Sequence, residues 1–352
     1  MPLLPLIAYP ASYRPCIQDL LVDGEAVRDY WLGVFEAHAN TWAELPVGDR
    51  RLADTPQWPA LKRDYLAGLE ALRANPGLRG CLSVLELTIY REEQFLAHGF
   101  PDPFVDMKRR AGDTALRTLP DLLHELDVLP RPQRGERLAH GLFAGNLFDM
   151  GSEAAVDAFR DSGLDFFALR DKVRPRPWAV DDLDAWLARV TAGSPSYRQA
   201  LVFVDNTGAD IVLGMIPLAR ELATDGIRVV LAANSKPALN DVTAEELREI
   251  LDRCTQLDDR TAALLRDDRI TVVESGCHSP LIDLTDVSPQ CCAAAEASDL
   301  LILEGMGRAI ESNYDARFTV DTLKVALIKD KMVADVLGVK LFDPVFRFET
   351  LD

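Results

Sequence analysis

The sequence LVFVDNTGADIVLGMIPLARELATDGIRVVLAANSKPALNDVT, residues 201–243, contains a complete strand–helix–strand pattern. Leu201–Val204 is a short apolar run of β-branched and aromatic residues, as is typical of a buried strand. Apolar side chains then recur at helical spacing from Ile211 to Leu222, and a second apolar run follows at Arg228–Ala233. A strand, helix and strand of these lengths form a βαβ unit, so the two strands are expected to be parallel.

Further apolar runs follow this unit, and each one ends in a polar or glycine-rich loop. Strands are predicted at residues 269–273, 300–303 and 322–328, with a further edge strand at 341–348. The polar residues at the ends of the predicted parallel strands are Asp205, Asn234, Glu274, Glu304 and Lys329. The carboxyl ends of parallel strands meet at one edge of a sheet, where ligands bind in open α/β folds. We therefore expect these side chains to form one site.

The first half of the chain has helical rather than strand patterns. Apolar faces repeat at helical spacing over residues 24–39, 58–72, 82–96 and 114–126, with turns rich in proline and glycine between them. We predict an all-helical N-terminal domain over residues 1–195. A Rossmann-like α/β/α sandwich with a largely parallel sheet is predicted over residues 196–352, so that the fold class is α/β and the site lies between the two domains.

Composition limits the classes of partner. The chain has 352 residues, 48% of them hydrophobic, and a formal net charge of −18, so nucleic acid and anionic membranes are not expected to bind it. No apolar run reaches the length of about 18 residues that indicates a membrane span, and no signal peptide is evident. The six cysteines include no CxxC pair. We therefore expect reduced thiols and a cytoplasmic location; the oligomeric state is left open.

Two carboxylates and an amide at the predicted sheet edge suggest a metal site. Asp205, Asn206 and Asp241 follow adjacent predicted strands. Two close carboxylates repel each other unless a cation lies between them. A carboxylate–amide–carboxylate set without thiolate or imidazole suits a hard cation such as Mg²⁺ or Mn²⁺. Taken singly, each residue is explained equally well by a turn with a helix cap.

Positive charge and glycines at the same edge suggest a phosphate. Lys329 directly follows an apolar strand, and Arg308 follows Gly305 and Gly307, where a new helix is expected to start at Arg308 and to offer free N–H groups to an anion. A metal, two basic residues and a glycine-rich turn together fit a phosphoryl group better than a neutral substrate.

The segment GLFAGNLFDMG, residues 141–151, breaks the helical pattern of the first half. Asn146 and Asp149 stand in it within an otherwise apolar run. Asparagine and aspartate often satisfy free backbone N–H groups at helix joins. The residues alone therefore favour a capped join over a functional site.

Several long motifs resemble those of the metal-dependent damage-control phosphatases, domain-of-unknown-function family 89. They are DNTGAD, LGMIPLAR, VVLAANSKPALNDVT, SDLLILEGMGRAIESN and LKVALIKD. The chain is most similar to the branch fused to a human pantothenate kinase paralogue and its stand-alone plant relatives. Thr207, where a smaller residue was expected, and Cys277-His278, where Ser or Gly was expected, depart from the family pattern.

The resemblance implies roles for individual residues. It implies a divalent cation (Mn²⁺, Mg²⁺, Co²⁺ or Ni²⁺) held by Asp205, Asn206 and Asp241. It also implies that Asn146 and Asp149 face the site, which reverses the preference for capping, and that Lys329 contacts the phosphate. The remaining residues expected to bind substrate are Asn234, Glu304 and Arg308.

We therefore predict a phosphatase that hydrolyses a small phosphorylated metabolite in metabolite repair, with 4′-phosphopantetheine or its oxidised forms as the substrate that the resemblance implies. Asp205 and Lys329 are the predicted catalytic residues. Asp205 either attacks phosphorus or positions a water molecule. The alternatives are a haloacid-dehalogenase-type phosphatase, a sugar-phosphate phosphatase and a non-catalytic protein that binds small molecules.

Overall fold

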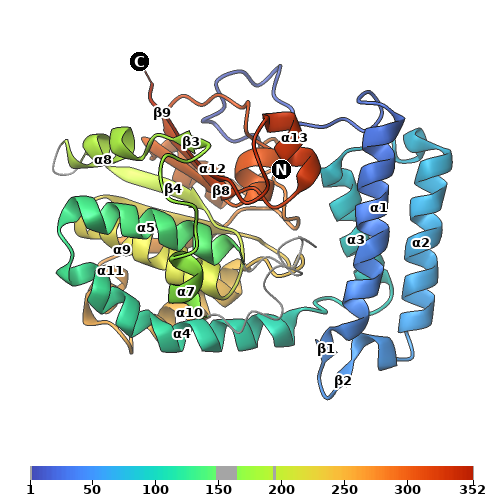
Figure 1. The fold of residues 1–352 in the computed structure, drawn as a ribbon, viewed down its shortest axis with the longest axis horizontal. Helices are drawn as coiled ribbons and strands as arrows, with labels where there is room; N and C mark the ends of the chain where they lie inside the picture. Colours follow the sequence, from blue (N-terminus) through green and yellow to red (C-terminus); the bar gives the residue numbers. More distant parts are fainter. Residues whose placement is uncertain (1, 148–164, 193–195, 352) are drawn as a thin grey trace.

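The computed structural model describes residues 2–147, 165–192 and 196–351. Its main feature is a seven-stranded sheet with the order β3-β9-β8-β7-β4-β5-β6 (Figure 1). The strands are β3 (Val180–Asp181), β4 (Gln199–Phe203), β5 (Arg228–Ala233), β6 (Ile270–Glu274), β7 (Leu300–Glu304), β8 (Asp321–Leu327) and β9 (Pro344–Glu349). Neighbouring strands from β8 to β6 are parallel, and β9 is antiparallel to β8. The predicted α/β fold with a largely parallel sheet is confirmed.

Helices cover both faces of the sheet, because alternate side chains of each strand point to opposite faces. In β4, Ala200 and Val202 belong to one hydrophobic core, and Leu201 and Phe203 belong to the other. The first core also contains residues from α4 (Val105–Val128), α5 (Arg131–Asn146), α7 (Phe166–Arg170), α8 (Leu183–Thr191), α9 (Ile216–Thr224) and α10 (Ala244–Cys254), with α11 (Asp259–Arg266) packed against it. The second core takes residues from α12 (Pro289–Glu296) and α13 (Lys331–Leu337).

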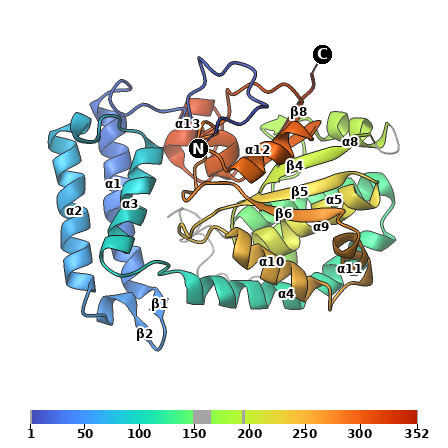
Figure 2. The ribbon, with the colours of Figure 1, turned by 180° about the vertical axis from the view of Figure 1, so that it is seen from behind.

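Three helices near the N-terminus form a bundle beside the sheet (Figure 1, blue, and Figure 2 from behind). They are α1 (Glu25–Thr41), α2 (Trp58–Ala74) and α3 (Val84–Ala97), and they match the helices predicted there. Their side chains share the second core with Leu201 and Phe203. Short elements connect them: η1 (Trp42–Glu44), β1 (Pro46–Val47), β2 (Arg50–Arg51), η2 (Leu52–Asp54) and η3 (Pro76–Arg79).

Helices on either side of residue 195 pack on the same sheet. Residues of α4 and α5 lie in one core with β4 and β7, and Val180 of β3 pairs with Val345 of β9. The division into domains at residue 195 stays a prediction. The helices α1 to α3 stand beside the sheet rather than on its faces (Figures 1 and 2).

The helix predicted after β4 begins differently from the expectation. The stretch Asp210–Met215 forms a π-helical turn, η4, and the α-helix α9 starts only at Ile216. A second π-helical turn, η5 (Met306–Glu311), follows β7, two residues earlier than the helix start expected at Arg308. Such turns often occur at functional sites, because they re-aim side chains that a regular helix would place elsewhere.

The prediction of a helix cap at Thr243, which depends on a single turn of chain, is confirmed. Thr243 caps α10, and its hydroxyl accepts from the backbone N–H of Glu246 while the Glu246 carboxylate accepts from the backbone N–H of Thr243.

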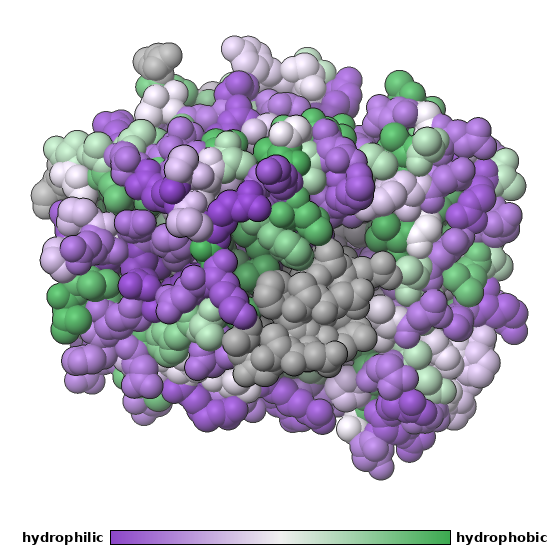
Figure 3. Space-filling view, viewed as in Figure 1, coloured by the Kyte–Doolittle hydropathy of each residue, from purple (hydrophilic) through white to green (hydrophobic). Residues whose placement is uncertain are grey.

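The face in Figure 3 is mostly hydrophilic, with apolar side chains in small groups. Among the described helices, none combines the length and the apolar character needed to cross a bilayer.

Candidate active site at the carboxyl edge of the sheet

Four strand ends and one helix end bring predicted site residues to one edge of the sheet. Asp205 lies two residues after β4, and Asn234 directly follows β5. Glu304 is the last residue of β7, Lys329 lies two residues after β8, and Asn146 ends α5. All five residues are at least 96% buried. The parallel arrangement of the strands therefore brings four of the five predicted strand-end residues together, whereas Glu274, the last residue of β6, is exposed.

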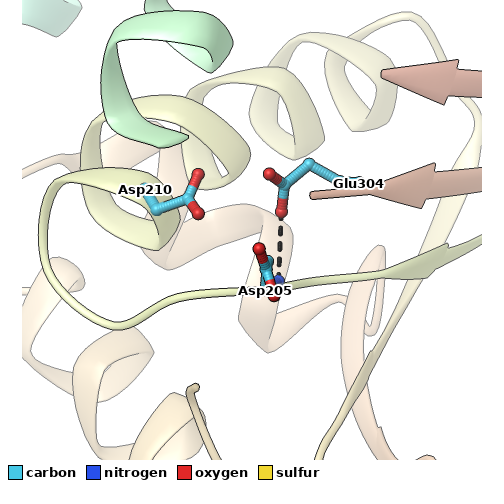
Figure 4. A group of neighbouring side chains, drawn as sticks. All are labelled: Asp205, Asp210 and Glu304. Carbon is cyan, nitrogen blue, oxygen red and sulfur yellow. Dashed lines mark hydrogen bonds between the residues drawn. The ribbon is translucent and has the colours of Figure 1, made fainter. Parts of the chain in front are cut away.

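Three carboxylates meet at the centre of this edge (Figure 4). Asp205, Asp210 and Glu304 each offer an oxygen atom, and these atoms lie within 4.8 Å of one another. The Nδ2 atom of Asn146 donates to all three, at 3.2 Å to Asp205, 3.1 Å to Asp210 and 3.1 Å to Glu304. An amide nitrogen has only two hydrogens, so it cannot satisfy three carboxylates fully.

Burial sets the electrostatics of this cluster. It raises the pKa of Asp205, Asp210 and Glu304, and the neighbouring carboxylates raise it further in Asp205 and Glu304. Arg308 and Lys329 oppose this effect at Asp205 and Glu304. The backbone N–H of Asp205 also donates to Glu304 at 3.0 Å, the bond drawn in Figure 4. Negative charge on these three carboxyl groups is therefore unfavourable unless a proton or a cation balances it.

The donor set fits a divalent cation. Among the described residues, Oδ1 of Asn146 and Oδ1 of Asp210 are buried without a hydrogen-bond partner. Both atoms are oxygen acceptors, and they adjoin a carboxylate cluster with too few donors. Hard cations such as Mg²⁺ and Mn²⁺ take oxygen ligands of this kind.

Arg308 joins the two aspartates predicted to hold the metal. Its Nη1 donates to Oδ1 of Asp205 and, at 3.2 Å, to the carbonyl oxygen of Pro280. Its Nη2 donates to Asn234 Oδ1 at 2.9 Å and to Asp241 Oδ2 at 2.7 Å. Burial alone would lower the pKa of Arg308, but Asp241 and Asp205 outweigh it, so the guanidinium stays charged. The structure thus brings Asp205, Asn234, Asp241 and Arg308 together as one network.

The Asn206 amide is oriented by carboxylates. Its Nδ2 donates to Asp205 Oδ2 at 2.8 Å and to Asp210 Oδ2 at 2.9 Å. Because the nitrogen side of the amide is held by two carboxylates, the amide oxygen is directed to the other side. Backbone bonds between the loops support this position, from Val242 N to Asp205 O at 2.9 Å and from Thr207 N to Asn240 O at 2.8 Å.

A cavity of about 200 Å³ opens onto this network. Its floor includes Asp205, Asn206, Asp241 and Lys329, and α1 and α3 supply the opposite wall. The Nζ atom of Lys329 donates to the carbonyl oxygen of Asn146 at 2.9 Å. The cavity is therefore the place where a ligand meets the predicted metal-binding residues and the predicted phosphate contact.

Gly305 allows the backbone after β7 to pass close to Asp205. It has a φ of +96°, which favours glycine. A Cβ atom at this position would lie 2.2 Å from Asp205 Oδ2 and 2.4 Å from its Cγ. The glycine-rich turn thus makes room for a carboxylate; the expectation that its N–H groups bind an anion stays a prediction.

Not every predicted residue is placed as expected. Asn146 ends α5, but its side chain donates to the carboxylate cluster rather than to a cap, so the preference for capping drawn from the residues alone was wrong. Asp149 lies outside the described residues. Glu304 contacts Asp205 and Asn146, and its role as a substrate contact, like that of Asn234, stays a prediction.

Asp210 belongs to the site and was missed from the sequence. It follows Asp205 by five residues and is 0% exposed in a segment that is otherwise apolar. An acidic residue near a helix start is commonly a solvated residue of the first turn, where the helix dipole stabilises its negative charge. The useful signal was its position in DNTGADIVLG, directly before a run of core residues.

Comparisons with known proteins agree on one family. A family model described as the damage-control phosphatase ARMT1-like domain matches residues 36–345. Damage-control phosphatase At2g17340 of Arabidopsis thaliana is 38% identical over 323 residues, which cover 90% of this chain and 87% of that protein.

Two further relatives are longer than this chain. Pantothenate kinase 2 of Arabidopsis thaliana is 38% identical over 98% of this chain, and the chain spans 41% of that protein's length. A 4′-phosphopantetheine phosphatase of Mus musculus is 33% identical over 98% of this chain and 48% of its own length. Among solved structures, a DUF89 family protein from Pyrococcus horikoshii has the same fold, with a TM-score of 0.64, 17% identity and coverage of 90% of this chain and 96% of that one.

Proposed function

The chain belongs to the damage-control phosphatase ARMT1-like family, and from this premise we propose that it is a metal-dependent phosphatase that hydrolyses a small phosphomonoester. The observation that carries the proposal is the cavity at the sheet edge. Its floor combines two carboxylates and an amide, Asp205, Asp241 and Asn206, with the buried cation Lys329. Oxygen ligands and a fixed positive charge in one cavity suit a phosphate group.

We assign the metal to Asp205, Asn206 and Asp241. All three line the cavity, whereas Asp210 and Glu304 do not. A cation that contacts a substrate must be reachable from the cavity, so Asp210 and Glu304 are better suited to hold the ligands in place from behind. Asp210 does so by accepting from the Asn206 amide nitrogen, which presents the amide oxygen to the cation.

The bound cation supplies Lewis-acid polarisation of a phosphate oxygen. Lys329 lines the cavity and would add a charge-assisted hydrogen bond to the phosphate. Both oxygens of Asp205 already accept hydrogen bonds, Oδ1 from Arg308 and Oδ2 from Asn146 and Asn206. These bonds occupy three of the roughly four lone-pair sites of a carboxylate, and we assign the remaining one to the cation. Asp205 would then position the reacting groups while the oxygen of a water molecule bonds to phosphorus and the P–O bond to the substrate's alcohol breaks.

The proposed substrate is a single phosphomonoester with a neutral arm, such as 4′-phosphopantetheine. A mouse relative bears the name of a phosphatase for that compound. The net charge of −18 disfavours polyanionic substrates at long range. The cavity wall from α1 adds apolar surface for an arm, with Trp31, Val34 and Phe35.

The state of the cysteines supports the proposed compartment. All six cysteines are free. A chain that keeps six unpaired thiols suits a reducing compartment, which supports the proposed cytoplasmic location.

The test is a metal-by-substrate assay of the purified chain after chelation. We expect no turnover of p-nitrophenyl phosphate or 4′-phosphopantetheine in the metal-free sample, and recovery when Mn²⁺, Mg²⁺, Co²⁺ or Ni²⁺ is added singly. Full activity in a sample that elemental analysis shows to be metal-free would refute the metal assignment. A preference for sugar phosphates of about tenfold or more in kcat/KM, equal to about 1.4 kcal/mol, would instead support the sugar-phosphate alternative.

A further inference from the structure

Arg91 is a buried cation in the wall of the cavity that α3 supplies, whereas the carboxylates of the site come from the loops of the sheet edge. It lies on α3 and is 2% exposed. Its side chain lines the same cavity as Asp205 and Lys329. None of the roles derived for the catalytic residues uses it.

The guanidinium of Arg91 is held on two sides but not on the third. Its Nε donates to Glu92 Oε1 at 2.8 Å, and its central carbon lies 5.6 Å from the centroid of the Phe35 ring. Among the residues that the structure describes, its Nη2 atom is buried without a hydrogen-bond partner. A buried charged donor without an acceptor is unfavourable, so a group that enters the cavity gains by supplying that acceptor.

Apolar side chains line the same cavity as Arg91 and the catalytic residues. Trp31 and Val34 come from α1, and Leu281 and Met306 come from the loops of the sheet edge. The indole nitrogen of Trp31 is already bonded to Gln18 at 2.6 Å, so this ring offers the cavity its apolar face. A ligand in the cavity therefore meets charged groups from the sheet edge and from α3, together with apolar surface.

We propose that Arg91 selects the substrate by its arm: its Nη2 donates to an oxygen acceptor, such as an amide carbonyl, on the arm rather than to the phosphate. The inference rests on the proposed phosphatase function and narrows it. The substrate class is a phosphomonoester whose largely neutral arm carries a carbonyl group and crosses apolar surface. A short phosphate ester without such an arm supplies no acceptor to the Nη2 atom of Arg91.

Glu92 explains why a neutral acceptor is sufficient. Its carboxylate already pairs with the Arg91 Nε atom, and its side chain is only 12% exposed. The pair therefore carries little net charge, and an unpaired N–H group remains to be satisfied. A carbonyl oxygen satisfies it without bringing a further charge into a buried place.

The experiment compares one substrate with an arm and one without. Arg91→Lys keeps a positive charge beside Glu92 but removes the forked guanidinium nitrogens. We expect this variant to lower kcat/KM for 4′-phosphopantetheine at least tenfold more than for p-nitrophenyl phosphate, mainly through KM. We also expect pantetheine, which lacks the phosphate, to inhibit hydrolysis of p-nitrophenyl phosphate by the unmodified chain at least tenfold more strongly than it inhibits the variant.

Two further variants keep the test decisive. The double variant Arg91→Met with Glu92→Gln leaves no unpaired buried charge and is expected to show the same shift in substrate preference. Arg79→Lys is the matched control, since Arg79 pairs with Glu93 and stacks on Tyr90 without lining the cavity. An equal effect on both substrates in the two Arg91 variants would overturn the inference while leaving the phosphatase function intact. No hydrolysis of either substrate by the unmodified chain with metal would refute the function itself.

Discussion

Asp205 is the residue at which the networks of the site meet. Its two oxygens and its backbone N–H contact four other residues, Asn146, Asn206, Glu304 and Arg308. These partners come from three separate parts of the chain, so the position of one carboxylate is fixed from several directions. Such support is what holds a metal ligand in a productive position.

The metal assignment predicts an order of effects among carboxylates. Asp241→Asn removes a proposed ligand and is expected to weaken Mn²⁺ binding by more than about 100-fold. Asp210→Asn keeps an oxygen that accepts from Asn206, so a loss of about tenfold is expected, in the range of a supporting residue. Isothermal titration calorimetry of the folded variants measures both values. The reverse order would show that the cluster of Asp205, Asp210 and Glu304 binds the cation directly.

A second prediction at this scale concerns Gly305. An alanine Cβ there would overlap the Asp205 carboxylate, so Gly305→Ala is expected to displace it and lower kcat/KM by about 100-fold or more, as misplacements of about 1 Å do. Gly338→Ala is the control, because Gly338 also has a positive φ but a Cβ atom added to it would have no described atom within 4 Å. It should cost about 1–2 kcal/mol of stability and leave kcat/KM unchanged. Equal kinetics in the two variants would contradict the prediction.

The two π-helical turns, η4 and η5, connect the sheet to the site. η4 begins with Asp210 and η5 contains Arg308, and each turn follows a central parallel strand. Both turns are fully buried. A π-helical turn is wider than an α-helical one. In η4 and η5 it brings Asp210 and Arg308 to the sheet edge, while the apolar residues of the same turns pack in the core.

Close packing of α5 on η4 positions Asn146. A Cβ atom at Gly145 would lie 2.8 Å from the Cα atom of Asp210 and 3.1 Å from the carbonyl oxygen of Ala209. Gly145→Ala is therefore expected to push α5 away, at a cost of about 1–3 kcal/mol in stability, and to weaken metal binding through Asn146.

Gly112→Ala is the control for Gly145→Ala. Gly112 lies within α4, and no described atom would lie within 4 Å of its added Cβ. The substitution should raise the free energy of unfolding by about 0.5–1 kcal/mol. Urea unfolding and calorimetry measure both variants, and a stable Gly145→Ala protein with unchanged metal affinity would show that the contact does not position Asn146.

A buried ion triad connects the helical bundle to the sheet. The Nζ atom of Lys108 lies 2.7 Å from Asp102 Oδ2 and 2.7 Å from Glu246 Oε1. Asp102 precedes α4, and Glu246 belongs to the capping box of α10. Burial alone would lower the pKa of Lys108, but Glu246 and Asp102 outweigh it and raise it. The triad therefore joins the end of the bundle to the helix that follows the loop of Asp241.

Removing the lysine tests this connection in the whole molecule. Lys108→Met leaves two carboxylates without a cation and is expected to lower the free energy of unfolding by about 3–5 kcal/mol. Lys331→Met is the control, because Lys331 pairs with Asp335 on the surface and its side chain is 74% exposed. A change within about 0.5 kcal/mol is expected there. Urea unfolding followed by circular dichroism measures both, and similar values would show that the triad contributes little.

The sequence by itself determined most of the strands and helices and the edge at which the site forms, but it did not predict β3, which lies in the half expected to be all-helical. Hydrophobic periodicity depends on residues a few positions apart, so it predicts Leu201–Val204 as a buried strand and Thr243 as a helix cap. Parallel strands then place Asp205, Asn234 and Lys329 at one edge, because the connections between them leave no other arrangement.

The tertiary structure alone decided which of these residues contact one another. Arg308 and Asp205 are 103 positions apart, and Asn146 and Glu304 are 158 apart. No local pattern relates such pairs, since their approach depends on how helices and sheet pack. The same is true of Asp210, which lies in the π-helical turn η4 and comes close to Asp205 there. It is also true of Arg91, which lines the cavity because α3 packs beside the sheet edge. An apolar helix face predicts that a surface is buried, but not which surface it meets.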